Sequence, residues 1–340
     1  MLPSPVPDLV QPTEGPLIDR FGRAHTYLRV SVTDRCNYRC TYCMPAAGLD
    51  WLPRADVLSY EEVARLVGVF ASMGVKRVRL TGGEPTLRRG IVELVGMIAS
   101  TPGIVDVSMT TNGHALAKQA GALAKAGLTR LNVSLDTLDP ERFSAITRGG
   151  DVRAVLAGID AALEAGLAPV KINCVVVQGV NDGDLVALVE HFSARPGTQV
   201  RFIEYMPFDG NGGRKQHVPA AALRAKLAER YTLAPLPPAG GGPSRDVQLD
   251  NGMVVGFISP ITEHFCDTCN RLRLQADGSL RTCLSRDRAP SLRDLLRGGA
   301  SDAELEKAIR TQVFAKVAGH EAHTDGDFRV FEGVMTRVGG

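Results

Sequence analysis

Six of the seven cysteines in this 340-residue chain fall into two groups of three. The first group, Cys36, Cys40 and Cys43, has the spacing Cys-x3-Cys-x2-Cys; in the second, Cys266-x2-Cys269 is followed by Cys283 after thirteen residues. A cubane iron–sulfur cluster takes four ligands, and so does structural zinc. Each triplet is therefore one ligand short of a closed site. This favours two 4Fe–4S clusters, each with one iron open to a small molecule.

Other metal chemistry remains possible at both triplets. The first could be a zinc knuckle completed by His25 or Asp34, or a redox-active Cys-x2-Cys pair. The second could be a Cys3His zinc site, because His264 stands two residues before Cys266. The seventh cysteine, Cys174, alternates with polar residues in an apolar run, so we expect a small core residue there.

The composition indicates an ordinary globular protein without a general affinity for nucleic acid or membranes. The net charge is +2, with 44% hydrophobic and 22% charged residues. Residues 1–16 contain several prolines and no apolar run of signal-peptide length, and we expect them to form a flexible tail. We expect a cytoplasmic protein, where thiols stay reduced and grouped cysteines serve as metal ligands.

Short β-rich runs alternate with amphipathic helical patterns through the first two-thirds of the chain. The predicted strands are Tyr27–Thr33, Arg77–Thr81, Asp106–Thr110, Arg130–Leu135, Val170–Val176 and Val200–Tyr205. The predicted helices between them are Ser59–Met73, Gly90–Ser100, Ala115–Ala126, Val152–Ala165 and Asp182–Ala194. Such connections predict parallel strands with right-handed crossovers. Six units without a seventh or eighth predict an α/β fold built as a partial, open six-fold (β/α) barrel.

The pattern changes at a Pro- and Gly-rich linker, residues 235–244. Beyond it we expect short strands at Met253–Ile258 and Leu272–Gln275, which carry the second triplet, and then a helical tail to about Ala318. The predicted domains are the barrel, residues 17–235, and a C-terminal extension, residues 236–340, that holds the second iron–sulfur cluster.

Several predicted strands carry cations between apolar residues, where a charge is costly unless it is solvated or paired. They are Arg29, Arg77, Arg79, Lys171, Arg271 and Arg273. Each could simply extend its charged end to solvent. Their recurrence on strands that lead to the cysteine triplets instead favours a polyanionic substrate, because arginine suits phosphate oxygens.

The first triplet, with Tyr42 before its last cysteine, resembles the radical S-adenosylmethionine (SAM) enzymes. In that superfamily three cysteines hold a 4Fe–4S cluster whose fourth iron binds SAM, which is cleaved to a 5′-deoxyadenosyl radical. The Gly82-Gly83-Glu84-Pro85 run resembles the superfamily's loop for the SAM amino group. The resemblance implies SAM contacts from Tyr42, Gly83, Ser134 and Met206.

One branch is matched more closely, the GTP 3′,8-cyclase family of molybdenum cofactor biosynthesis. The matching motifs are Arg77 to Pro85, Thr110-Thr111-Asn112-Gly113, Leu131 to Asp136, Phe202 to Pro207, and Cys266-x2-Cys269-Asn270-Arg271-Leu272-Arg273 with Cys283. The resemblance implies conversion of GTP to (8S)-3′,8-cyclo-7,8-dihydroguanosine 5′-triphosphate, with GTP contacts from Arg29, Arg79, Thr110, Lys171, Arg271, Leu272 and Arg273. It also implies catalytic roles for Arg271 and Arg273 and for the terminal Gly339-Gly340, although a bare Gly-Gly end is also typical of a frayed terminus.

The same resemblance implies partners. These are a flavodoxin- or ferredoxin-type electron donor, cyclic pyranopterin phosphate synthase as the next enzyme, and a homodimer as a candidate assembly. A radical SAM enzyme that modifies peptides, an iron–sulfur electron carrier and a zinc-stabilised binding protein remain as alternatives. A carrier would have closed four-ligand clusters and no need for the strand cations.

Overall fold

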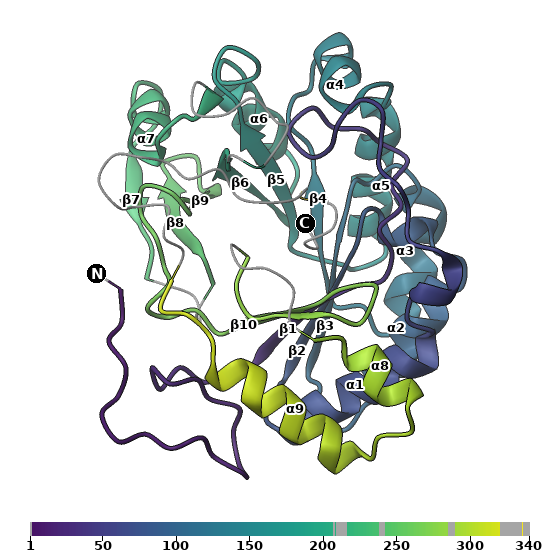
Figure 1. Ribbon diagram of the computed structural model, residues 1–340. Helices are drawn as coiled ribbons and strands as arrows, with labels where there is room; N and C mark the ends of the chain where they lie inside the picture. Colours follow the sequence, from purple (N-terminus) through teal and green to yellow (C-terminus); the bar gives the residue numbers. More distant parts are fainter. Residues whose placement is uncertain are drawn as a thin grey trace.

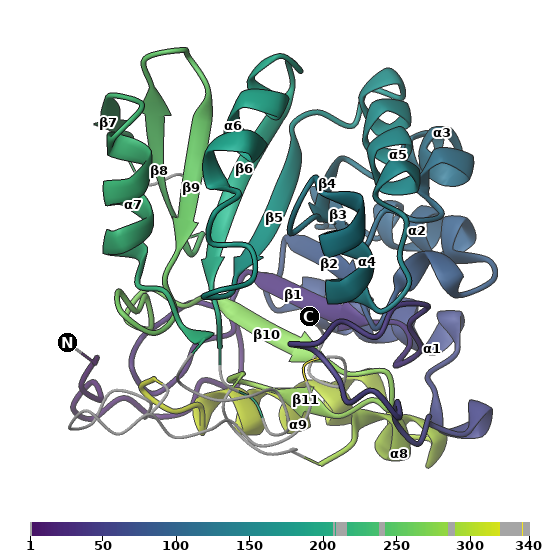
Figure 2. The same cartoon turned by 90° about the horizontal axis from the view of Figure 1, so that it is seen from above.

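The computed structural model describes residues 2–206, 208, 216–237, 242–284, 290–319 and 335. Its centre is a run of six parallel strands: β1 (Tyr27–Ser31), β2 (Arg77–Thr81), β3 (Asp106–Thr111), β4 (Arg130–Ser134), β5 (Val170–Val176) and β6 (Thr198–Glu204). The connecting helices are α1 (Tyr60–Ser72), α2 (Ile91–Ala99), α3 (Leu116–Lys125), α4 (Pro140–Thr147), α5 (Val152–Glu164) and α6 (Leu185–Ser193), with the short 3-10 turns η1 (Arg54–Asp56) and η2 (Pro85–Leu87). Figures 1 and 2 show the helices on the outside of the curved sheet.

Some of the helices begin at a side-chain cap that the sequence supplies. At the start of α1 the Ser59 hydroxyl accepts a hydrogen bond from the Glu62 amide, and the Glu62 carboxylate accepts one from the Ser59 amide at 2.7 Å. At the start of α4 the Asp139 carboxylate accepts a single hydrogen bond from the Arg142 amide. Each helix then turns an apolar face to the sheet, which places the hydrophobic core between the two layers.

The sheet stays open, and strands from the C-terminal third extend both of its edges. Within the described residues its order is β11-β10-β1-β2-β3-β4-β5-β6-β9-β8-β7. These added strands are β7 (Leu233–Pro235), β8 (Ser244–Leu249), β9 (Val254–Ile258), β10 (Arg271–Leu274) and β11 (Leu280–Arg281). The open sheet confirms the predicted partial barrel with a C-terminal extension.

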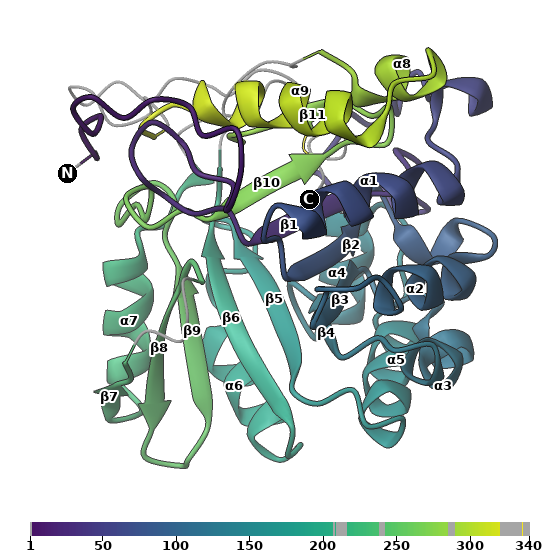
Figure 3. The same ribbon diagram turned by 90° about the horizontal axis from the view of Figure 1, so that it is seen from below.

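One edge of the sheet pairs segments far apart in sequence. Strand β10 lies parallel to β1, and the helices α8 (Leu292–Arg297) and α9 (Asp302–Phe314) lie beside this edge (Figure 3). Helix α9 has its own capping box between Ser301 and Glu304. This pairing places the second cysteine triplet next to β1, the strand that leads into the first triplet.

The predicted elements agree with the structure to within a few residues. The sequence interpretation omitted α4, α7 (Ala220–Ala228), β7, β8 and β11, and it placed β6 two residues late, at Val200. The domain boundary at residue 235 and the flexibility of residues 1–16 stay predictions. No helix in the described part of the chain is long and apolar enough to cross a membrane.

Candidate active site

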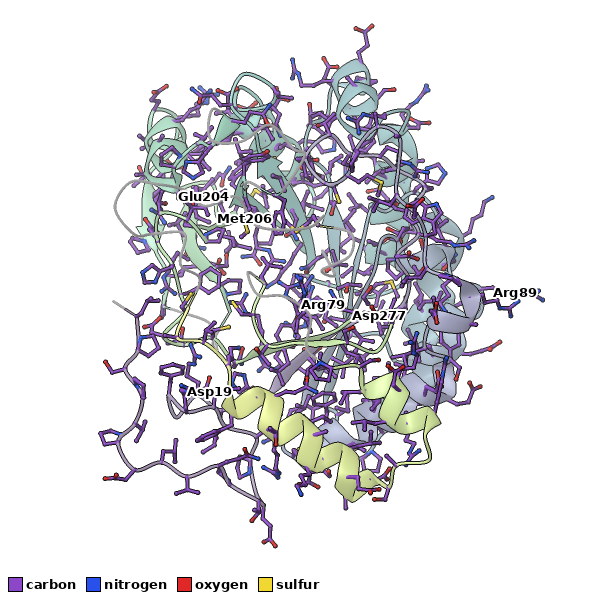
Figure 4. All side chains as sticks on the ribbon, in the orientation of Figure 1. Asp19, Arg79, Arg89, Glu204, Met206 and Asp277 are labelled. Carbon is purple, nitrogen blue, oxygen red and sulfur yellow. The ribbon has the colours of Figure 1, made fainter. Side chains whose placement is uncertain are left out.

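A cavity of about 410 Å³ opens at the concave side of the sheet and reaches the carboxyl ends of its strands. It collects most of the residues predicted for the site. Those that line it are Cys36, Cys40, Cys43, Tyr42, Gly83, Ser134, Met206, Arg29, Arg79, Thr110, Lys171, Arg271 and Arg273. Figure 4 shows Arg79, Met206 and Glu204 around the centre of the molecule.

The loop of the first triplet follows β1 and is anchored on the C-terminal end of α4. The amides of Arg39 and Thr41 donate to the carbonyls of Thr147 and Ile146, at 3.0 and 2.9 Å. The Arg148 guanidinium donates to the carbonyl of Arg39 at 2.6 Å. Helix α4, which the sequence interpretation omitted, therefore fixes where the three thiols stand.

Gly82 and Gly83 pack directly against this loop. The Gly83 amide donates to the Thr33 carbonyl at 2.7 Å, and a Cβ on Gly83 would lie 2.3 Å from the Arg35 carbonyl oxygen. Only glycine allows so close a backbone approach. The Gly-Gly pair was predicted to make room for a ligand; it also seats the loop that carries Cys36.

Glu84 ties the glycine loop to the end of β3. Its buried carboxylate accepts hydrogen bonds from the Thr111 hydroxyl at 2.7 Å and from the Asn112 amide at 2.6 Å. The side-chain nitrogen of Asn112 in turn lies 3.9 Å from the Cys36 sulfur. Glu84 is thus a positioning residue that connects three loops, and it was only part of a motif in the sequence interpretation.

Tyr42 connects the triplet loop to the segment that follows β4. Its hydroxyl donates to the Asp136 carboxylate at 2.7 Å. Burial raises the pKa of Asp136 to about 6, although the bonds from Tyr42 and from the Val175 amide oppose that rise. The pair fixes the Tyr42 ring beside Cys43.

Cationic side chains from neighbouring strands form another wall of the cavity, where they lie at paired positions of the sheet. Arg29 of β1 lies between Arg273 of β10 and Arg79 of β2, and Arg271 lies opposite Tyr27. Burial and then the neighbouring Arg273 hold the pKa of Arg29 well below its usual value. Burial and Arg271 lower that of Arg273 to about 10. Like charges placed so close together favour the binding of a polyanion.

Lys171 and Arg201 continue this wall on β5 and β6. Burial and Arg201 lower the pKa of Lys171 to about 8, and burial and Arg79 lower that of Arg201 to about 9. Among the described residues, Nη1 of Arg79 and Nε and Nη2 of Arg201 are buried without a hydrogen-bond partner. These buried donors fit the oxygens of a polyanion.

The second triplet lies next to this wall. Its sequence neighbours Phe265, Asn270 and Leu284 line the cavity. The Cys269 sulfur lies 3.7 Å from both the Arg271 guanidinium and the Lys316 ammonium. Burial alone would raise the pKa of Cys269, but these two cations lower it to about 6. A thiolate held ready in this way is a suitable metal ligand.

In the part of the chain that the structure describes, no three His, Cys, Asp or Glu side chains are arranged to hold a single metal ion. An iron–sulfur cluster spreads its cysteine ligands over several irons, so it requires a wider arrangement of sulfurs than one zinc ion does. The three thiols of the first triplet line one cavity, and nearby cations stabilise the Cys269 thiolate of the second triplet. Both arrangements fit the ligands of an iron–sulfur cluster.

Two family models divide the chain between them. Residues 30–192 match the radical SAM superfamily, and residues 198–322 match the family described as Molybdenum Cofactor Synthesis C. A GTP 3′,8-cyclase of Caulobacter vibrioides is 48% identical over 316 residues, which cover 91% of this chain and 90% of that protein. The chain belongs to the GTP 3′,8-cyclase family.

Other members of the GTP 3′,8-cyclase family are similarly related. The one from Brucella canis is 47% identical, with 92% of each chain covered, and the one from Rhodopseudomonas palustris is 46% identical, with 90% of each covered. Among solved structures, Streptococcus suis SuiB bound to S-adenosylmethionine has a TM-score of 0.58 at 17% identity, covering 84% of this chain and 68% of that one. At this identity the likeness shows the radical SAM fold alone. As a family member the chain uses SAM and two 4Fe–4S clusters.

Three residues predicted from the family resemblance need comment, and so does the seventh cysteine. The Leu272 side chain is packed in the core on the other face of β10, so its contact with GTP would have to come from the backbone. Gly339 and Gly340 lie outside the described residues. Cys174 is fully buried in the core, which confirms its predicted role.

Arg201 is the site residue that the sequence interpretation missed. It sits between Val200 and Phe202, the same apolar setting that singled out Lys171, and it lines the cavity from the adjacent strand. In the register of the sheet it lies opposite Asn173, two residues beyond Lys171. The sequence contained the same signal, a cation between apolar residues of a predicted strand, but the sequence interpretation did not apply it to the strand that begins at Val200.

Proposed function

We propose that the protein is a radical SAM GTP 3′,8-cyclase, which converts GTP to (8S)-3′,8-cyclo-7,8-dihydroguanosine 5′-triphosphate in an early step of molybdenum cofactor biosynthesis. The observation that carries this proposal is the wall of cations between the two cysteine triplets, from Arg273 through Arg29 and Arg79 to Arg201. A triphosphate is the polyanion that such a wall suits.

In this proposal Cys36, Cys40 and Cys43 hold the cluster that binds SAM, and Cys266, Cys269 and Cys283 hold the cluster near the substrate. Gly83, Ser134 and Met206 contact SAM, and Tyr42, held by Asp136, lies against its adenine. The cluster held by the first triplet would bind SAM and, with one electron from a donor protein, would supply the radical chemistry needed to take a hydrogen atom from the 3′ carbon of GTP. The other residues bind and orient GTP for that step.

The phosphates of GTP are bound by Arg29, Arg79, Lys171 and Arg201, while Arg271 and Arg273 hold the nucleotide beside the second cluster. Thr110 supplies a buried hydroxyl that has no hydrogen-bond partner in the described structure and lines the same cavity. The enclosed position of these donors limits their contact with water and so strengthens each contact with the anion.

The reaction needs partners that remain proposals. A flavodoxin- or ferredoxin-type protein would supply electrons, and cyclic pyranopterin phosphate synthase would take the product. We place the enzyme in the cytoplasm, because its thiolate ligands require a reducing compartment. Its assembly as a homodimer is a proposal of the same kind.

The test is metal content combined with SAM cleavage. Protein reconstituted anaerobically with iron and sulfide should hold about eight irons, four for each cluster. After reduction it should release 5′-deoxyadenosine from SAM in the presence of GTP, with conversion of the GTP. Stoichiometric zinc at the second triplet, or SAM cleavage that leaves GTP unchanged, would contradict the proposal.

A further inference from the structure

A short segment after α9 wraps the second cysteine triplet. The Lys316 ammonium lies 3.7 Å from the Cys269 sulfur and donates to the Arg271 carbonyl at 2.8 Å. Three residues later, a Cβ on Gly319 would lie 3.0 Å from the Cys266 sulfur. This segment, residues 316–319, therefore contacts two of the three cysteines.

Arg23 fastens the segment to the start of the barrel. Its guanidinium donates to the carbonyls of Cys266 at 2.7 Å, Val317 at 2.7 Å and Ala318 at 2.6 Å. Asp19 completes the arrangement with an ion pair to Arg23 at 2.6 Å. Figure 4 shows Asp19 at the end of α9, where this segment begins. Lys316 is consequently held in one place relative to Cys269.

Two cations contact the Cys269 sulfur, and they differ in their exposure to substrate. Arg271 lines the cavity, so a bound nucleotide can compete for its guanidinium. Lys316 is 2% exposed and is not among the described residues that line the cavity. Its N–H donors therefore stay at the sulfur whether or not substrate is bound.

We propose that Lys316 is a positioning residue that donates a permanent hydrogen bond to the Cys269 sulfur and thereby raises the reduction potential of the second cluster. The inference rests on the proposed assignment of that cluster to Cys266, Cys269 and Cys283. One-electron reduction adds one negative charge to the cluster and its thiolates. A donor held at a ligand sulfur stabilises that added charge, and hydrogen bonds to the sulfurs are among the factors that set such potentials.

The experiment compares Lys316→Met and Lys316→Gln with the unsubstituted holoenzyme in an anaerobic redox titration followed by electron paramagnetic resonance. Dithionite supplies the electrons. Lys226→Met is the matched control, because the Lys226 ammonium also donates to a backbone carbonyl, that of Asp182 at 2.6 Å, but on α7 away from both triplets. A Cys36→Ala/Cys40→Ala/Cys43→Ala variant identifies the signal of the second cluster.

Lys316→Met should shift the potential of the second cluster to more negative values and leave that of the first unchanged. Lys316→Gln keeps a donor without the charge and should shift it less, and Lys226→Met should shift neither. An unchanged second potential in an iron-loaded Lys316→Met protein would overturn the inference. So would loss of the second cluster in both Lys316 variants, because Lys316 would then serve assembly and not tuning. A triple-cysteine variant without iron would instead count against the proposed second cluster itself.

Discussion

Arg29 of β1 lies opposite Arg273 of β10, paired in register on two parallel strands from the two ends of the chain. Both guanidiniums line the cavity, and burial together with neighbouring arginines lowers the pKa of each. Two half-buried like charges side by side repel each other, and this repulsion favours binding of an anion. Strand β10 extends the sheet and also adds Arg271 and Arg273 to the cationic wall of the cavity.

Arg201, which was absent from the predicted site, should contribute to GTP binding. Arg201→Ala removes a charge-assisted contact worth about 1.5–3 kcal/mol, so GTP affinity should fall about 10- to 150-fold while SAM affinity changes little. Arg65→Ala is the control, because Arg65 pairs with Asp302 outside the cavity. Isothermal titration calorimetry measures both affinities. Equal GTP affinities for the two variants would show that Arg201 does not contact the nucleotide.

GTP binding should weaken as the pH rises through about 8. Lys171 loses its proton there, because burial and Arg201 lower its pKa to about 8, and the neutral amine no longer attracts the phosphates. Phosphate groups are already ionised in this range, so they do not cause the change. Equilibrium dialysis at pH 7 and pH 9 should show weaker binding at pH 9.

The control for the pH effect is Lys171→Met. This variant should bind GTP more weakly at pH 7 than the unsubstituted protein. It should lose the part of the difference between pH 7 and pH 9 that Lys171 causes and keep the part that comes from Arg201, whose pKa is lowered by burial and Arg79 to about 9. A wild-type affinity that is the same at both pH values would contradict the role given to Lys171.

The sequence predicted the first triplet and the six parallel strands because both depend on local patterns. It could not predict that β10 pairs with β1, since a four-residue strand carries no information about a partner so far away in sequence. The position of Lys316 beside Cys269 depends on the same non-local pairing. Helix α4 was missed for another reason: it has eight residues, so its buried positions, Phe143, Ile146 and Thr147, repeat over little more than one turn.

Gly83→Ala should disrupt the first cluster. The added Cβ would lie 2.3 Å from the Arg35 carbonyl oxygen, so the backbone of the triplet loop must move. Iron content should fall by about four atoms per chain. Gly68→Ala is the matched control in α1, where nothing lies within 4 Å of the new methyl group. It should keep all its iron and gain about 0.5–1 kcal/mol in the free energy of unfolding, measured in urea. Full iron content in Gly83→Ala would show that the loop tolerates the displacement.

Replacing Cys36, Cys40 and Cys43 with alanine should separate the two clusters. The variant should retain about four irons at the second triplet and should cleave no SAM. Cys174→Ala is the control, because Cys174 is a fully buried core residue, and this variant should retain both clusters. Iron analysis and chromatography of 5′-deoxyadenosine give the result. SAM cleavage by the triple variant would show that the first triplet does not bind the SAM-cleaving cluster.

The central claim is that the cavity brings SAM and GTP together so that a hydrogen atom passes from the ribose to the 5′-deoxyadenosyl group. The most direct measurement uses GTP that carries deuterium at the 3′ carbon, with reduced protein holding both clusters and with SAM. Mass spectrometry should find one deuterium in the 5′-deoxyadenosine and none at the former 3′ position of the cyclised product. Unlabelled 5′-deoxyadenosine, formed while the labelled GTP remains intact, would contradict the account.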